Sequence, residues 1–351
     1  MLNKYKDLRD RYKILTLFLL GLVVISSINL VLALRNDQIQ RELLLIQTHN
    51  RQLVQARSGA QTVKLFLKDL EIQLLTLSQV PDVVLLDEQK TRERFENLID
   101  QAEDTPFIGI GSLDKDGKAK IITNRERMSV GEGTNFSERE YFKWAKDPLN
   151  KGKIYITSPF ISQAGISKDK NVLALITPVY YNDEFNGIII FAVLLNDFSD
   201  KFIEPLRIYQ AGQSVLIQQD GLVIAGDGKL LNKNIFNYVQ NINKNIFSED
   251  EGAINWVFQY PEDGAKEQIV TFKRINIDHQ SWTLFIINNK DIINSYLEPL
   301  VEKYPVSANS NSSLLVIIFG TLFTGFFFIL IAHRSHSQGF KSGMQRERES
   351  K

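Results

Sequence analysis

Cysteine is absent from this 351-residue chain, and histidine occurs only four times, at His49, His279, His333 and His336. Without thiols the chain can form neither a disulfide framework nor a thiolate metal site. The four histidines are scattered, so they do not indicate a metal site either. The fold must therefore be held together by apolar cores, and a chain of this length can supply more than one.

A net charge is also lacking, since 41 basic residues balance 41 acidic ones. Residues 1–13 and 333–351 each hold five basic and two acidic residues, a net charge of +3, which leaves −6 for residues 14–332. The long middle of the chain has no basic surplus of the sort that nucleic-acid binding requires. We expect no nucleic-acid partner.

The sequence also contains no recognisable catalytic pattern. It has no nucleophile–base pair, no glycine-rich phosphate loop and no cluster with metal-ligand spacing. One acidic pair, Asp114 and Asp116, lies in an expected hairpin turn, and its surroundings depart from a calcium loop, which needs further oxygen ligands. The sequence predicts a protein that is not an enzyme and that uses no metal or cofactor.

The chain does contain two long apolar runs, residues 14–34 and 314–332, with no Asp, Glu, Lys or Arg in either. As helices they would reach roughly 30 Å, the thickness of a bilayer's hydrocarbon core. We expect two transmembrane helices, and the basic flanks place residues 1–13 and the short tail 333–351 in the cytoplasm. A cleaved signal peptide is the alternative for the first run, but the run is long for one and Val31-Leu32-Ala33 is a poor cleavage site.

Residues 35–79 contain no proline and one glycine, and their apolar residues recur at helical spacing. We predict a long stalk helix, ended by Pro81, and a short second helix over residues 88–103, which together fill residues 35–104. The first apolar positions follow a rhythm typical of paired helices, with Asn50 at a seam position: Ile39, Leu43, Ile46 and Leu53. We expect a homodimer, although one amphipathic helix packed along its own domain would give a similar pattern.

From residue 106 the pattern changes to short strands separated by turns. We expect a hairpin at 107–123, a helix at 137–146 with Ser137 as its N-cap, strands at 153–160 and 172–180, and a buried strand at 187–195. The theme repeats, because a second Asp-Gly turn, Asp220-Gly221, follows Asp116-Gly117 by 104 residues. We predict an α+β fold with two units of antiparallel sheet, residues 105–205 and 206–304, and a linker at 305–313 before the second span.

The order and spacing of these segments resemble the double Cache domains, which are extracellular sensor domains of bacterial chemoreceptors, sensor kinases and cyclases. The likeness rests on Asn135–Phe142 (NFSEREYF), Gly152–Pro159 (GKIYITSP), Val172–Val179 (VLALITPV) and, in the second unit, Trp282-Thr283-Leu284. The resemblance implies two PAS-like units on a long helix, one distal and one proximal to the membrane. It also implies that the distal unit binds a small-molecule ligand.

Carried over to this sequence, the resemblance implies a ligand site at Arg139, Tyr141, Phe142, Tyr155 and Phe160. Arg139 matches the arginine that binds a ligand carboxylate, a task that suits the planar guanidinium fork. The alternatives are that Arg139 forms a salt bridge with a neighbouring carboxylate, such as that of Glu138 or Glu140, and that the aromatic residues are ordinary core residues.

The sequence departs from the family pattern at the two acidic positions that hold a ligand's ammonium group. Ser162 stands at one of these positions, and the other falls near Ala192. A buried ammonium without a carboxylate partner is costly. We therefore expect a carboxylate or an apolar molecule as the ligand, and not an α-amino acid.

These features predict a membrane-anchored sensory input that binds a small molecule or a partner outside a bacterial cytoplasmic membrane, in the periplasm or the open medium, and signals through its transmembrane helices. Receptors of this kind continue into an effector module, whereas 19 residues follow the second run here. We expect either a fragment of a longer protein or an input that works through a separate effector. The alternative is a non-sensory scaffold such as a polysaccharide chain-length regulator; large rings in detergent would favour it, and monomers or dimers would favour the sensor.

Overall fold

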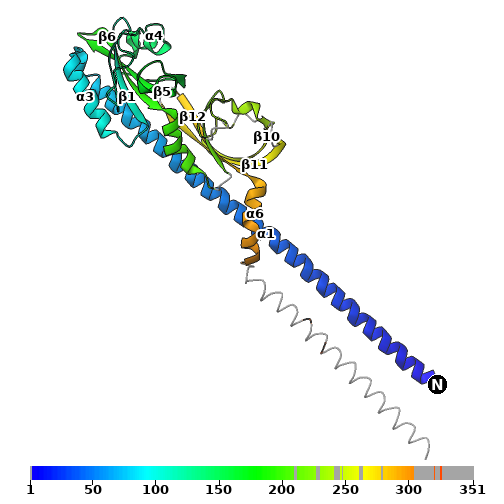
Figure 1. Cartoon of the computed structure of the whole chain (residues 1–351). Helices are drawn as coiled ribbons and strands as arrows, with labels where there is room; N and C mark the ends of the chain where they lie inside the picture. The colour runs from blue at the N-terminus through cyan, green and yellow to red at the C-terminus, as the bar shows by residue number, and fades with distance from the viewer. Residues whose placement is uncertain are drawn as a thin grey trace, which may run out of the picture. The chain divides into compact units, whose positions relative to one another are not determined.

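The computed structural model describes residues 2–208, 212–226, 230–240, 246, 248–260, 264–277, 280–303, 320 and 325 (Figure 1). The chain divides into two compact units. The first consists of Met1–Gln47 and Asn294–Lys351, and the second of Thr48–Ile293. The fold is α+β, as the sequence predicts, with a long N-terminal helix and two antiparallel sheets.

The helices are α1 (Leu2–Leu77), α2 (Pro81–Val84), α3 (Glu88–Gln101), α4 (Glu140–Lys146), α5 (Leu195–Phe198) and α6 (Lys290–Lys303). Short 3-10 or π turns are η1 (Pro148–Asn150), η2 (Gly165–Ser167), η3 (Ser199–Ile203), η4 (Glu204–Leu206) and η5 (Ile235–Asn237). The strands of the first sheet are β1 (Phe107–Asp114), β2 (Ala119–Asn124), β3 (Tyr155–Ile156), β4 (Phe160–Ile161), β5 (Asn171–Tyr181) and β6 (Glu184–Leu194). Those of the second sheet are β7 (Gln213–Gln218), β8 (Val223–Gly226), β9 (Val239–Gln240), β10 (Glu251–Tyr260), β11 (Gly264–Ile277) and β12 (Gln280–Asn289).

The two sheets repeat one strand order. The first, which we call the distal sheet, runs β2-β1-β6-β5-β3, with β4 also paired to β5, and the second, the proximal sheet, runs β8-β7-β12-β11-β10-β9. In both, a hairpin is followed in space by the last strand of the unit, and every pairing is antiparallel. This arrangement confirms the duplicated sheet unit expected from the repeated Asp-Gly turns.

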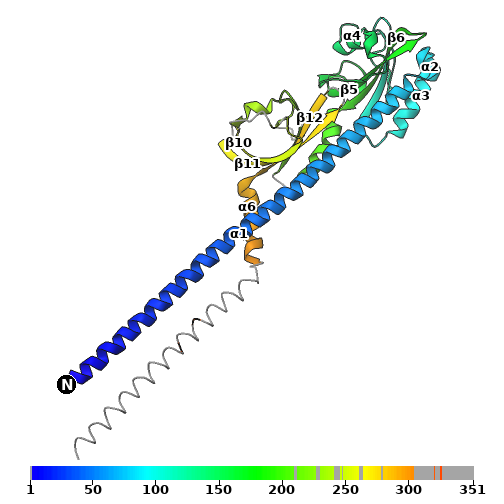
Figure 2. The same ribbon diagram turned by 180° about the vertical axis from the view of Figure 1, so that it is seen from behind.

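Helix α1 forms a common wall for the second unit, and it lies along both sheets in Figures 1 and 2. Its buried residues recur every three or four positions: Ala60, Val63, Leu67, Leu70, Leu74 and Leu77. They share one apolar core with Phe107 and Phe191 of the distal sheet and with Trp282 and Leu284 of the proximal sheet. Because 3.6 residues make a helical turn, this spacing places one continuous stripe of α1 against the two sheets.

The other face of each sheet has its own smaller core. In the proximal unit, large side chains fill it, including Phe258, Phe272 and Phe285, and Trp256 packs on Phe285 with ring centroids 5.2 Å apart. In the distal unit, α4 covers the sheet through Tyr141, Phe142 and Ala145. The candidate site lies on this face.

Helix α1 is longer than the stalk predicted from the sequence, because it begins at Leu2 and includes the first apolar run. It ends at Leu77, shortly before Pro81, which is the first residue of α2. In the part of α1 that belongs to the first compact unit, the side chains of Ile39, Leu43 and Ile46 are exposed on the single chain. The homodimer stays a prediction.

In the described part of the chain, no helix combines the length and the apolar character that crossing a membrane would need. The second apolar run, residues 314–332, lies outside the described residues except for Gly320 and Gly325. A Cβ atom added to Gly320 would lie 3.1 Å from Cδ1 of Ile25, so this position approaches the first apolar run.

The glycine at the start of the buried part of β6 is required by its surroundings. Gly187 pairs with Asp114 of β1 at a φ of +141°, and a Cβ atom there would overlap the carbonyl oxygen of Leu113. Gly152 also has a positive φ, +72°, but a Cβ atom on it meets nothing within 4 Å. A comparison of substitutions at these two positions therefore distinguishes the cost of backbone strain from the cost of a steric clash.

We predict that Gly187→Ala lowers the free energy of unfolding by about 2–4 kcal/mol, because strain and overlap add. Gly152→Ala should cost only about 1–2 kcal/mol, the strain alone. Urea denaturation of the full chain measures both. Equal losses at the two positions would show that the contact with Leu113 relaxes without cost.

Candidate ligand-binding site

A row of small residues crosses the distal sheet on the face that α4 covers. Gly109 of β1 lies opposite Asn124 of β2 and Ala192 of β6, and Ala192 lies opposite Ala174 of β5. Residues directly opposite each other in antiparallel strands point to the same face. Ala174 and Ala192 have only methyl groups as side chains and Gly109 has none, so this row leaves space that larger side chains would fill. Gly111 lies on the same strand as Gly109, two residues further along, and leaves further space.

These small residues form the floor of a cavity of about 100 Å³. Its walls are mostly apolar: Ile108, Ile110, Leu113, Ile122, Phe136, Tyr141, Phe160, Ile166, Val172 and Ile190. The size is comparable to the ~150 Å³ engineered cavity that binds benzene. The cavity thus suits a ligand of only a few non-hydrogen atoms.

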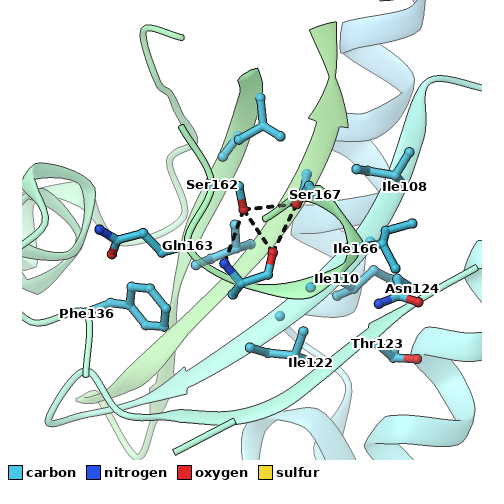
Figure 3. Close-up of a pocket in the computed structure, with 18 of the residues that line it drawn as sticks. Ile108, Ile110, Ile122, Thr123, Asn124, Phe136, Ser162, Gln163, Ile166 and Ser167 are labelled. Carbon is cyan, nitrogen blue, oxygen red and sulfur yellow. Dashed lines mark hydrogen bonds between the residues drawn. The ribbon is translucent and has the colours of Figure 1, made fainter. Parts of the chain in front are cut away.

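The loop between β4 and β5 closes one side of the cavity through its serines (Figure 3). The Ser162 hydroxyl donates to the carbonyl of Ala164 at 2.9 Å and lies 3.0 Å from the Ser167 hydroxyl, which donates to it. The backbone N–H of Gly165 donates to the carbonyl of Val130 at 2.8 Å, which ties this loop to the segment before α4. These hydroxyls hold the loop and have protein partners of their own.

Arg139 occupies the position just before α4, with extended backbone angles, and its carbonyl accepts hydrogen bonds from the N–H groups of Phe142 and Lys143. The predicted helix start at Ser137 is wrong by three residues, since α4 begins at Glu140. The N–H of Ser137 instead donates to the Asn135 side chain at 2.7 Å, and this local turn competes with the helix. As a result Arg139 lies at the junction of loop and helix, where its side chain reaches the cavity.

Among the described residues that line the cavity, Arg139 has the one charged side chain. Its guanidinium carbon lies 5.6 Å from the centre of the Phe160 ring. The neighbouring acids are engaged elsewhere: Glu138 forms an ion pair with Lys143 at 2.9 Å, and Glu140 accepts a hydrogen bond from the Tyr155 hydroxyl at 3.1 Å. Within the described ranges the half-buried Arg139 has neither a carboxylate partner nor a side-chain hydrogen bond, so no acidic side chain there is paired with its positive charge.

Tyr141 supplies a phenol hydroxyl to the cavity wall. Its side chain is 7% exposed, and burial raises its pKa to about 12, although the positive charge of Arg139 opposes this rise. The hydroxyl is therefore neutral at physiological pH and carries a proton that it can donate. A cation and a neutral donor that line a mostly apolar cavity are chemically suited to an anionic group.

The structure brings three of the five predicted site residues to the cavity, namely Arg139, Tyr141 and Phe160. Phe142 lies in the core under α4, 1% exposed, with its ring 5.8 Å from that of Phe185. Tyr155 packs on Trp144 with ring centroids 5.1 Å apart, outside the cavity lining. Whether any of the five binds a ligand stays a prediction.

Sequence reasoning missed the floor of the site. Gly109 and Gly111 alternate on β1, and glycines within a strand often mark the close approach of a ligand or another backbone, which was the available signal. Ser162 and Ala192, the two residues at or near the family's acidic positions, both line the cavity, so no carboxylate is present in the described lining. In the described part of the chain, no three His, Asp or Glu side chains form a metal-binding group.

A family model described as a Cache domain, of the double type, matches residues 32–296. The chain therefore belongs to the double Cache family, the class of extracellular sensor domain that its sequence resembles. No curated protein matches the sequence.

Many solved structures match this chain, among them the following three. The extracellular domain of the putative histidine kinase vpHK1S-Z8 has 16% sequence identity and a TM-score of 0.56, over 73% of this chain and 96% of that one. The ligand-binding domain of Pseudomonas fluorescens chemoreceptor CtaA in complex with L-isoleucine has 17% identity and a TM-score of 0.54, over 73% and 98%. An extracellular ligand binding receptor from Desulfohalobium retbaense DSM5692 has 15% identity and a TM-score of 0.52, over 66% of this chain and only 39% of that one.

We predict that Tyr141 makes stability fall at high pH. Its folded-state pKa of about 12 lies above the ordinary value of 10.0, so stability is fully present below pH 10 and is lost as the pH rises toward 12. Relative to Tyr141→Phe, the native chain should lose up to about 2–3 kcal/mol over this range. Urea denaturation of both chains between pH 9 and 12 measures the difference; parallel curves would mean that Tyr141 ionises as freely when folded as when unfolded.

Proposed function

We propose that this chain is the signal-input part of a membrane-anchored bacterial receptor, and that its distal cavity binds a small carboxylate with an apolar body. The observation that carries this proposal is the Arg139 guanidinium, which has no carboxylate partner within the described ranges, at a cavity whose described lining is otherwise uncharged and mostly apolar. A cation in such surroundings favours an anionic ligand, because charge-assisted hydrogen bonds strengthen where water is excluded.

The chemistry of the lining favours one kind of ligand over the amino acids that some relatives bind. CtaA has been crystallised with L-serine, L-alanine and L-isoleucine, and Pseudomonas aeruginosa PctC with GABA. All these ligands carry an ammonium group. Here Ser162 and Ala192 offer no negative charge to such a group, and the Ser162 hydroxyl already donates to Ala164. An α-amino acid would leave its ammonium desolvated and without a counter-charge.

The deep end of the cavity supports a monocarboxylate. The Asn124 amide oxygen accepts from the N–H groups of Glu126 and Met128, and its amide nitrogen donates to the carbonyl of Met128 at 3.0 Å. Asn124 is thus engaged with its own loop, and the floor beyond it consists of Gly109, Ala174 and Ala192. A short hydrocarbon tail would lie on this floor.

The proposal includes the placement in the membrane. The two apolar runs, residues 14–34 and 314–332, act as transmembrane anchors, and their basic flanks keep both ends in the cytoplasm. Two copies pair through α1, and a ligand bound outside shifts the relative position of the two spans, which a cytoplasmic effector detects. In this proposal the role of the chain is ligand binding and not catalysis. Membership in the Cache family favours this sensory role over a chain-length regulator.

Removal of the Arg139 charge tests the carboxylate assignment. We expect butyrate, isovalerate and hexanoate to raise the melting temperature of the full chain, and their amides and L-valine to have little effect. Arg139→Gln should weaken carboxylate binding about 10- to 100-fold, the range for one charged hydrogen bond. The matched control is Lys143→Gln, which removes the same charge from an exposed side chain of α4 and should change binding less than about twofold.

The panel also shows what would contradict the assignment. Amides that bind as tightly as the acids would mean that Arg139 does not recognise an anion. Stabilisation by L-valine alone would restore an amino-acid ligand. If no compound of the panel stabilises the chain, the carboxylate proposal is wrong for this size class.

The position of the ligand can be tested separately by filling the cavity. Ala192→Leu places a larger side chain over the floor, next to Gly109 and Ala174. We expect carboxylate binding to fall at least about tenfold, with the melting temperature changed by no more than about 8 °C, the effect of a modest overpacking cost. Equal affinity in the native and the substituted chain would place the ligand elsewhere.

A further inference from the structure

Two glutamines of the proximal sheet reach across to the distal unit, close to the ligand cavity. The Gln280 side-chain nitrogen donates to the carbonyl of Ile156 on β3 at 2.5 Å. The Gln218 side-chain nitrogen lies 3.4 Å from the Ser158 hydroxyl, two residues further along the same segment. Residues 156–158 of the distal unit are therefore held by two side chains from neighbouring strands β12 and β7.

Gln280 is fixed at both ends of its amide. Its oxygen accepts a hydrogen bond at 3.0 Å from the indole N–H of Trp282, whose side chain is 1% exposed in the core shared by the two sheets. Trp282 in turn lies opposite Gln218 in the pairing of β12 with β7. Since a glutamine amide can donate only from its nitrogen, this pair of bonds sets its orientation.

On the distal side, the same segment is bonded to the cavity floor. Thr157 follows Ile156, and its N–H donates to the carbonyl of Ala174 at 2.9 Å. The Thr157 hydroxyl accepts from the N–H of Ala174 at 3.1 Å, so both backbone groups of this floor residue are tied to Thr157. A ligand that displaces β5 at Ala174 would move Thr157 and, with it, the carbonyl that Gln280 holds.

On the output side, β12 leads directly into the exit helix. Gln280 is the first residue of β12, Asn289 is the last, and α6 begins at Lys290 with no loop between them. Ten extended residues span about 33 Å. Paired on both sides, by β11 and β7, the strand is a stiff connection from the Gln280 contact to the start of α6.

We propose that Gln280 couples the ligand cavity to the exit helix, by fastening the Ile156–Ser158 segment to the start of β12. Its loss uncouples the two ends without altering the cavity, because Gln280 does not line it. The inference rests on the proposed function in one respect, namely that a ligand in the cavity is the signal. The hydrogen bonds from the cavity floor through Thr157 and Gln280 are present whether or not a ligand is identified. Coupling in this sense requires that an event at one end changes an equilibrium at the other.

The test is a double-mutant cycle read by amide hydrogen exchange on the full chain, with Ala192→Leu as a built-in occupant of the cavity. We expect Ala192→Leu to change the exchange rates of residues 280–293 by about 2- to 30-fold, the range for energetic coupling between sites. In the Gln280→Leu background this change should vanish, while the change that Ala192→Leu causes in β1 and β2 persists. Gln280→Asn, which keeps the amide but shortens its reach, should behave like Gln280→Leu.

The matched control is Gln259→Leu, which replaces an exposed glutamine of β10 in the same sheet, one whose side-chain oxygen accepts a hydrogen bond from Gln240 of the neighbouring strand. It should leave the response of residues 280–293 intact. The proposal is overturned if Ala192→Leu changes nothing in these residues, or if it changes them equally with and without Gln280. Failure of the carboxylate panel, in contrast, would overturn the ligand assignment and leave this result standing.

Discussion

A single stripe of apolar side chains on α1 supports both sheets, and the remaining structure depends on it. Leu67, Leu70 and Leu74 pack in the same core as the distal and the proximal strands. Polar contacts fasten the helix further down, where Arg57 forms an ion pair with Glu251 and the buried Thr271 hydroxyl donates to Gln52 at 2.9 Å. Neither sheet can bury the face that α1 covers without this helix. The distal and proximal sheets therefore share one source of stability.

The wall that α1 provides leaves the opposite face of each sheet free for a different use. The proximal sheet fills it with aromatic side chains around Phe285, whereas the distal sheet leaves a cavity over Gly109, Ala174 and Ala192. The same strand order thus supports a packed core in one copy and a cavity in the other. The two copies also differ in charge, because Arg139 brings a cation to the distal cavity and no acid is present in its described lining.

The sequence predicted the features that depend on regular spacing. Helical periodicity indicated the buried stripe of α1, Pro81 marked its end, and the two Asp-Gly turns located the repeated hairpins of both sheets. It did not reveal β10 and β11, the long hairpin of the proximal sheet, because polar residues such as Asn255, Gln268 and Lys273 interrupt their apolar runs. Those residues are tolerated because the strands pair with each other along ten positions, from Glu251 with Lys273 to Tyr260 with Gly264.

The sequence predicted the candidate site only at residues whose side-chain type suggests ligand binding. Arg139, Tyr141 and Phe160 could be named from the resemblance to the family, but Phe142 and Tyr155, which were named with them, lie outside the cavity lining. The direction of Phe142 depends on where α4 begins, after the local turn at Asn135, whereas Tyr155 lies on β3 and packs on Trp144. The cavity itself arises from side chains that are missing, and such a gap becomes visible only when strand register places Gly109, Ala192 and Ala174 in one row.

That row of small residues determines the size of the cavity independently of its charge. Size and shape are set on the sheet by three or four backbone positions, whereas charge is set on the opposite wall by one residue at the entry to a helix. A methyl group added or removed on the floor alters which hydrocarbon fits and leaves the cation in place. Under the proposed function, single substitutions on the floor therefore change the length of the hydrocarbon that fits, while Arg139 keeps the class of head group unchanged.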